Sequence, residues 1–167
     1  MRFKLWLEMI IHEDEEARIR EAEPSDIPGY FVHSTEDPKD ALSIYENGFD
    51  LRKFHRTVRK YRTPEYMWQA SPKGVYALAG GHEQYERRPW ISFKADINKA
   101  LILEEKAPFG NAKDTLWKLY GQPTAAQFRN ALMKDGYQAI LRPGSEQIIL
   151  DPKIITILDV GNVAKNV

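Results

Sequence analysis

The sequence predicts a mixed α+β domain of short, mostly antiparallel strands with flanking helices. The first observation is that short apolar runs are interspersed with segments of helical periodicity. The second is that tight turns join the last runs, since a Pro-Gly-Ser turn and an Asp-Pro turn separate YQAILR, EQIILD and KIITIL. Tight turns connect antiparallel strands, whereas parallel strands need long crossovers. A doubly wound parallel sheet is therefore disfavoured.

Composition excludes several classes of protein. The chain has 167 residues, 43% of them hydrophobic, which is enough for a buried core. Its 24 basic residues balance 24 acidic ones, so global charge makes no case for nucleic acid or an anionic membrane as partner. Cysteine is absent, which excludes disulfides, thiol catalysis and cysteine-based zinc sites. No apolar run reaches the roughly 18–20 residues that span a bilayer, and we expect a cytoplasmic protein.

The N-terminal segment is expected to be a separate amphipathic helix. Residues 3–22 carry an apolar stripe in their first half and many charges in their second half, and Pro24 then ends the helical pattern. We therefore divide the chain into a helical appendage, residues 1–24, and a domain, residues 25–167.

The domain begins with a strand and a helix. The aromatic and β-branched run GYFVHST predicts the strand. Asp37 and Pro38 are typical of a helix start, and Gly48 of its end. The buried face of this helix is predicted to be Ala41, Leu42, Ile44 and Tyr45.

The rest of the domain is predicted element by element. Residues 51–70 are basic and aromatic without clear periodicity, which indicates a long loop or irregular helix. Strands are expected at 74–78, 90–95 and 100–104, and one or two helices between 112 and 135, the second capped by Thr124. Three short strands follow in the last third of the chain.

Common catalytic signatures are missing from the sequence. It contains no GxGxxG after a strand, no GxxxxGK[ST], no HExxH and no GxSxG. The four histidines are scattered, so we expect no metal site. What is left is a dispersed set of residues on predicted strands: His33, Tyr76, Tyr85 and Glu146.

The segments around these residues resemble a known family. FVHST, KGVYAL and SEQIILDP, in that order, are similar to the three signature strands of the diphtheria-toxin and poly(ADP-ribose) polymerase branch of ADP-ribosyltransferases. That branch is characterised by a His-Tyr-Glu triad. A helix ending in ENGF and a strand DGYQAIL fall where the family has a helix and a Gly-Tyr strand. The resemblance covers about residues 30–158.

This resemblance implies a fold and a function. The implied fold is a split β-sandwich, and the implied reaction transfers ADP-ribose from NAD to a macromolecule with release of nicotinamide. The acceptor is expected to be protein rather than nucleic acid, as for a toxin-like enzyme of phage or bacterial origin. NAD would be the substrate, and neither metal nor membrane would be needed.

The resemblance also assigns roles to particular residues. His33 would hydrogen-bond the adenine-side ribose, the Ser34 backbone would hold the nicotinamide carboxamide, and the Thr35 hydroxyl would help. Gly74 would let the ligand lie close to the chain. The remaining roles are those of the ring walls and the catalytic carboxylate: Tyr76, Tyr85 and Glu146.

Elementary chemistry agrees with such a residue set. Loss of nicotinamide leaves an oxocarbenium-like ribose, as in glycoside hydrolysis. Two aromatic rings can sandwich a flat nicotinamide, and a carboxylate can stabilise the developing cation.

Several positions depart from the family pattern. Ser34 stands where the branch usually carries Gly, and Tyr66 or Tyr61 could replace Tyr85 as the second wall. Gly144, two residues before Glu146, replaces the Glu or Gln of arginine-modifying toxins and argues against arginine as acceptor. The basic and aromatic residues of 51–70 could hold the NAD pyrophosphate or dock a nucleic acid, or form a solvated loop.

Each residue also has an ordinary structural interpretation. His33 could be a core or turn histidine, the tyrosines could be packing residues, Thr35 could only start the next turn, and Glu146 could be a solvated hairpin residue. Two alternatives to a transferase therefore stay open: a non-catalytic binding or virion-structural module of the same fold, and an NAD glycohydrolase.

Overall fold

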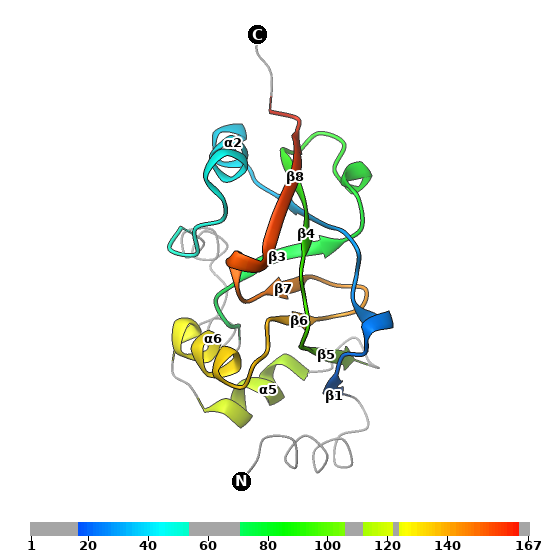
Figure 1. The fold of residues 1–167 in the computed structure, drawn as a ribbon, viewed down its shortest axis with the longest axis vertical. Helices are drawn as coiled ribbons and strands as arrows, with labels where there is room; N and C mark the ends of the chain where they lie inside the picture. Colours follow the sequence, from blue (N-terminus) through cyan, green and yellow to red (C-terminus); the bar gives the residue numbers. More distant parts are fainter. Residues whose placement is uncertain (1–16, 54–70, 106–111, 122–123, 164–167) are drawn as a thin grey trace.

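In a computed structural model, the chain forms a mixed α+β structure around a mostly antiparallel sheet (Figure 1). The structure describes residues 17–53, 71–105, 112–121 and 124–163. Within these ranges eight strands form one sheet in the order β1-β5-β6-β7-β3-β2-β4-β8. Neighbouring strands are antiparallel, except that β5 and β6 are parallel. The predicted fold class, α+β with largely antiparallel strands, is confirmed.

The strands and helices have the following bounds. The strands are β1 (Ala17–Glu21), β2 (Phe31–Ser34), β3 (Val75–Ala79), β4 (Trp90–Ala95), β5 (Ala100–Glu105), β6 (Ala139–Leu141), β7 (Gln147–Ile149) and β8 (Ile155–Gly161). The helices are α2 (Pro38–Asn47), α5 (Ala112–Tyr120) and α6 (Ala125–Lys134), with 3-10 turns η1 (Pro24–Asp26), η2 (His82–Gln84) and η3 (Pro152–Ile154). Each strand predicted beyond residue 25 is present, and where one or two helices were expected between 112 and 135 there are two, α5 and α6.

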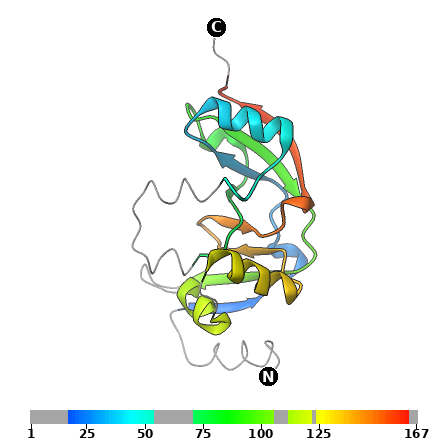
Figure 2. The same cartoon turned by 90° about the vertical axis from the view of Figure 1, so that its left-hand side faces the viewer.

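The sheet has two parts that run in different directions. In Figure 1, β8 follows the long axis of the molecule, while β3, β7 and β6 run across it. The helices are divided in the same way: α2 contacts β4 and β8, and α5 contacts β1 and β5 near the opposite end (Figure 2). The two parts meet at β2 and β3, whose ladder consists of the pairs Phe31–Ala79 and Val32–Leu78.

Two buried clusters explain why the central strands are apolar without alternation. Leu101 and Leu103 of β5 pack into a cluster with α5 and α6, while Ala100 and Ile102 of the same strand pack into a second cluster with Phe31 and Phe93. A strand that is covered on both faces needs apolar residues at successive positions.

The ends of α2 follow the sequence signals, but its buried face does not. The Asp37 carboxylate accepts a hydrogen bond from the Lys39 amide at 2.9 Å, and Gly48 ends the helix with a φ of 84°. Ala41 is buried, whereas Leu42 and Tyr45 are 37% and 45% exposed. The prediction that both belong to the buried face is wrong, because α2 lies on the sheet through Ala41.

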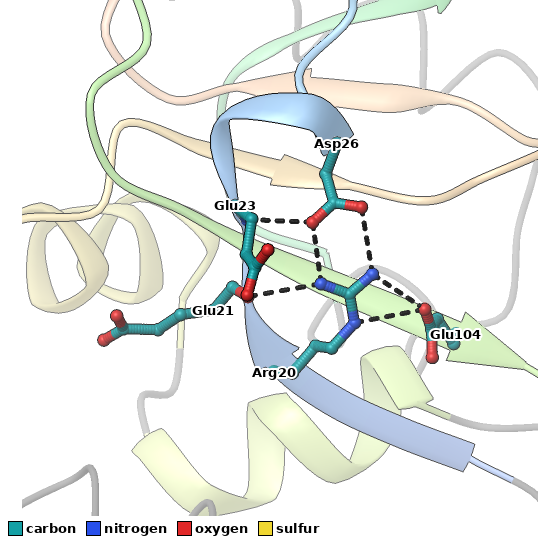
Figure 3. A network of polar contacts seen from close by, with 5 residues as sticks. All are labelled: Arg20, Glu21, Glu23, Asp26 and Glu104. Atoms are coloured by element: carbon teal, nitrogen blue, oxygen red, sulfur yellow. Dashed lines mark hydrogen bonds and ion pairs between the residues drawn. The ribbon is translucent and has the colours of Figure 1, made fainter.

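The expected helix over residues 3–22 is wrong for residues 17–21, which form β1. Ile19 is buried and pairs with Leu103 of β5. Arg20, one of the charged residues that suggested a solvated helical face, is instead paired: its guanidinium contacts Asp26 of η1 at 2.7 Å and Glu104 of β5 at 3.0 Å (Figure 3). Residues 1–16 lie outside the described residues, so the division at residue 24 stays a prediction, with β1 already part of the sheet.

Candidate functional site

Three of the predicted site residues come from three neighbouring strands. His33 lies on β2, Tyr76 on β3, and Glu146 directly precedes β7; these strands are adjacent in the order β7-β3-β2. Tyr76 pairs with Ile148, two residues after Glu146. Side chains far apart in the sequence are thus carried to one region, near the place where the two parts of the sheet meet.

His33 touches the strand that carries Tyr76. Its Nδ1 atom lies 2.6 Å from the Tyr76 carbonyl oxygen. Because a carbonyl can only accept, Nδ1 carries the proton, and in the neutral ring Nε2 is then an acceptor. Burial lowers the pKa of His33 below its usual 6.5; the Tyr76 carbonyl opposes this shift and the positive charge of Arg88 adds to it. The imidazole is therefore neutral at pH 7.

The ring environment of His33 is aromatic. The Phe49 ring meets it edge-on, with centroids 5.4 Å apart and planes at 86°, and Phe49 in turn contacts Phe93. Phe49 is the last residue of the ENGF motif, which covers the end of α2 and the two residues after it. This part of the motif helps to hold the histidine ring in place.

Tyr76 is anchored at both ends of its side chain. Its ring packs against the cluster formed with α5 and α6, and its hydroxyl donates to the carbonyl of Pro72. Burial raises the pKa of Tyr76; a hydrogen bond with Ser71 opposes the shift, the Glu146 carboxylate adds to it, and Arg142 opposes it. The side chain is partly buried, so packing accounts for part of its role.

Tyr85 and Glu146 belong to the same electrostatic environment. Tyr85 is partly buried at the end of η2, and burial raises its pKa, with Arg88 lowering it and Glu146 raising it. Glu146 itself is exposed. The Glu146 charge raises the pKa values of both Tyr76 and Tyr85, and the Arg88 charge lowers those of both His33 and Tyr85. Tyr61 and Tyr66 lie outside the described residues.

Ser34 and Thr35 differ in the state of their hydroxyls. The Ser34 hydroxyl is buried without a hydrogen-bond partner, the single such side-chain atom in the part of the chain that the structure describes. The Thr35 hydroxyl donates to the Asp37 carbonyl at 2.9 Å, and the Thr35 amide donates to the Pro89 carbonyl at 3.1 Å. The Thr35 hydroxyl thus serves the turn that begins α2, as the structural interpretation of this residue expected.

Gly74 has a packing role that sequence reasoning did not give it. A Cβ atom there would lie 2.8 Å from both Ile148 Cγ2 and the Ile149 carbonyl oxygen. Real Cβ atoms do not approach backbone so closely, so glycine is needed for the approach of β7. The approach of β7 is thus sufficient to explain the glycine, and the expected contact between Gly74 and a ligand stays a prediction.

Two polar side chains that sequence reasoning missed fasten the segments around the site. Gln147 is only 3% exposed; its Oε1 accepts from the Arg142 amide at 2.9 Å, and its Nε2 donates to the carbonyls of Arg142 and Ser145 at 2.9 and 2.8 Å. It closes the turn that precedes Glu146. A polar residue inside an apolar strand was the available signal. Asn162, after β8, holds the segment that contains Tyr85.

Neither a metal-binding group nor a membrane-spanning helix in the described part of the chain, nor a known relative, was found that would narrow the choice of function. Among the residues that the structure describes, no group of three or more His, Asp or Glu side chains could hold a metal ion, and no helix there has the length and apolarity that crossing a membrane requires. Comparisons with protein-family models, curated proteins and solved structures found no match to this chain. Its function must be inferred from its own residues.

Proposed function

We propose that this protein is an NAD-dependent ADP-ribosyltransferase of the His-Tyr-Glu type, with a split β-sandwich fold, that transfers ADP-ribose to a macromolecule. The observation that carries the proposal is the adjacency of β2, β3 and β7, which brings together His33, Tyr76 and Glu146 from the three segments that resemble the family. A protein acceptor is proposed ahead of a nucleic acid.

The chemistry assigns one task to each residue. His33 would hydrogen-bond a ribose hydroxyl, and the bond between its Nδ1 and the Tyr76 carbonyl fixes the orientation of the ring. The aromatic ring of Tyr76, with Tyr85, would bind the nicotinamide ring by stacking. The exposed Glu146 carboxylate would stabilise positive charge that develops on the ribose.

The proposed reaction needs only NAD and the acceptor. The bond between ribose C1′ and the nicotinamide nitrogen breaks, and its electron pair leaves with neutral nicotinamide. A nucleophilic group of the acceptor forms the new bond to C1′ and loses its proton, which Glu146 or water can take up. Water in place of the acceptor would give free ADP-ribose, the glycohydrolase reaction.

The test is nicotinamide release from NAD by the wild type and two matched variants. Glu146→Gln removes the charge and keeps the shape, and we expect turnover to fall about 100- to 1,000-fold. Glu46→Gln is the control, since Glu46 is an exposed residue near the end of α2, and its turnover should match the wild type. Thermal unfolding of both variants establishes that they fold.

The products distinguish the candidate activities. Label from adenine-labelled NAD on an added protein extract supports transfer, and free ADP-ribose alone would indicate a glycohydrolase. If the wild type releases no nicotinamide and NAD leaves its melting temperature unchanged, the enzyme proposal is wrong and a non-catalytic module takes its place.

A further inference from the structure

The C-terminal end of β8 packs against the segment that carries Tyr85. Gly161 pairs with Trp90, and a Cβ atom on Gly161 would lie 2.1 Å from the indole. The same indole stacks on the His82 ring, with centroids 4.2 Å apart and planes at 8°. The residue after β8 is thereby placed against residues 82–88.

Asn162 uses this position to hold that segment. Its Nδ2 atom donates to the carbonyl oxygens of Tyr85, Glu86 and Arg88 at 3.2, 3.2 and 3.0 Å. Three carbonyls around one atom require a donor there, which identifies it as the amide nitrogen. An amide nitrogen has two protons, so one of them is shared between acceptors.

The backbone at Asn162 is specialised for this contact. Its φ of 56° makes it the single non-glycine residue with positive φ in the described ranges. Asn, Asp and Gly tolerate this left-handed conformation, whereas most other residues are strained in it. The left-handed residue comes directly after β8, where the carbonyls of the neighbouring segment lie.

The segment held by Asn162 borders the candidate site. Arg88 precedes Pro89, whose carbonyl accepts the Thr35 amide, and Trp90 pairs with Ser34. Arg88 therefore lies beside the end of β2, where His33 is found. The effect of its charge on the pKa values of His33 and Tyr85 agrees with this position.

We propose that Asn162 is a positioning residue that fixes Tyr85 and Arg88 beside His33 before NAD binds. This inference rests on the proposed function and assigns to the site a residue that does not touch substrate. Tyr85 would contact the nicotinamide ring, and the Arg88 guanidinium would face the negatively charged part of the dinucleotide. Without Asn162 these side chains would have to be ordered by the ligand, at the expense of affinity.

Two substitutions test this role without adding backbone strain. Asn162→Gly keeps the left-handed conformation and removes the amide. Asn162→Asp also tolerates that conformation but points carboxylate oxygens at three carbonyls, so attraction becomes repulsion. Asn98→Asp is the matched control, because it makes the same change of charge at an exposed residue elsewhere in the chain.

The first measurement is limited trypsin cleavage of the full chain, followed by mass spectrometry. The bond after Arg87 lies inside the held segment, and Pro89 protects the bond after Arg88. We expect cleavage after Arg87 to be about tenfold faster in both Asn162 variants and unchanged in Asn98→Asp, because exposed loops are cut in proportion to their opening. Equal cleavage in all four proteins would overturn the proposal, whether or not the protein is an enzyme.

The second measurement separates positioning from a general structural role. For both Asn162 variants we expect the KM for NAD to rise about tenfold, with kcat changed less than threefold and the Tm within a few degrees. Faster cleavage with an unchanged KM would show that Asn162 holds the segment but does not serve the site, and would refute the proposal. Absence of nicotinamide release from the wild type would overturn the proposed function and, with it, the role of Asn162 in NAD binding; the cleavage assay would still show whether the segment is held.

Discussion

The Nδ1 atom of His33 lies 2.6 Å from the carbonyl oxygen of Tyr76, and this contact joins β2 to β3 beyond the last pair of their ladder. The ladder ends at Val32–Leu78, so the histidine side chain satisfies a carbonyl that no neighbouring amide of β2 reaches through that ladder. One interaction therefore fixes the tautomer of His33 and the position of the Tyr76 backbone. Substitution of His33 should therefore lower the stability of the fold and, under the proposed function, also weaken NAD binding.

The first prediction concerns the pH dependence of stability. The pKa of His33 is lowered in the folded protein, so below about pH 6.5 the unfolded chain takes up a proton that the folded chain does not. The free energy of unfolding should fall as the pH falls below 6.5, by at most about 1.4 kcal/mol per pH unit from this residue. In His33→Asn, which keeps a donor near the position of Nδ1, this contribution should vanish.

Urea unfolding between pH 5 and pH 8 measures this difference. The other three histidines are common to both proteins, so the wild-type curve minus the His33→Asn curve isolates His33. Parallel curves for the two proteins would contradict the lowered pKa.

The second prediction separates packing from ligand binding at Gly74. Gly74→Ala places a methyl group 2.8 Å from the Ile149 carbonyl, and we expect it to cost about 1–3 kcal/mol of stability. Gly29→Ala is the control: nothing lies within 4 Å of its Cβ position, so the change should be within about 0.5 kcal/mol. Chemical denaturation of both variants provides the comparison. A Gly74→Ala protein as stable as the wild type but unable to bind NAD would favour the predicted ligand role over the packing role.

Local signals in the sequence were enough for most elements of the fold. Asp37 and Thr124 each cap a helix through their side chains, as their positions predicted. Residues 17–21 were misassigned because the partner of their charges is remote: Arg20 and Glu104 are 84 positions apart. Helical periodicity in a charged segment says nothing about such a partner. Pairing with β5 decided the conformation.

In the candidate site, too, residues within local motifs could be predicted, whereas residues that act through contacts distant in the sequence could not. Its proposed chemical residues were chosen from the motifs around His33, Tyr76 and Glu146, and the structure places them on β2, on β3 and directly before β7. The side chains that hold them in place could not, because Gln147 and Asn162 act by hydrogen bonds to backbone carbonyls. A carbonyl is present at every position, so it leaves no mark in the sequence.

The third prediction concerns acid unfolding and the ion pairs of β1. Hydrogen bonds from the Arg20 guanidinium lower the pKa of Asp26 from 3.8 to about 2. The stabilisation is present above pH 3.8 and is lost as the pH falls toward 2. Arg20→Gln should remove the stabilisation that comes from Arg20 and so raise the pH midpoint of acid unfolding. Circular dichroism between pH 5 and pH 1.5 measures this midpoint. Arg52 lowers the pKa of Asp50 in the same way, but these residues are two positions apart, so their pair can also form in the unfolded chain. Arg52→Gln should therefore leave the midpoint nearer that of the wild type.

The last prediction compares Gln147, whose side-chain nitrogen donates to carbonyls, with Gln138, whose side-chain oxygen accepts from amides. Gln147 is buried and donates to two carbonyls, so Gln147→Glu points a carboxylate at the oxygens of Arg142 and Ser145. We expect this variant to lose about 2–3 kcal/mol at pH 7. Gln138 uses its Oε1 to accept from the amides of Asn98 and Lys99, and Gln138→Glu keeps that acceptor, so it should be tolerated.

The pH dependence of these two variants checks the cause. A buried carboxylate that keeps one donor, the Arg142 amide, but faces two carbonyl oxygens has a raised pKa. Gln147→Glu should therefore regain stability relative to the wild type as the pH falls from 7 toward 5, where protonation restores one donor. Gln138→Glu should show no such recovery, because its carboxylate is stabilised by two amides. Equal losses for both variants at pH 7 would mean that the closed turn before Glu146 does not depend on the donor of Gln147. If the turn does depend on it and the proposed function is right, nicotinamide release by Gln147→Glu should recover with stability, since the same hydrogen bonds close the turn that carries Glu146.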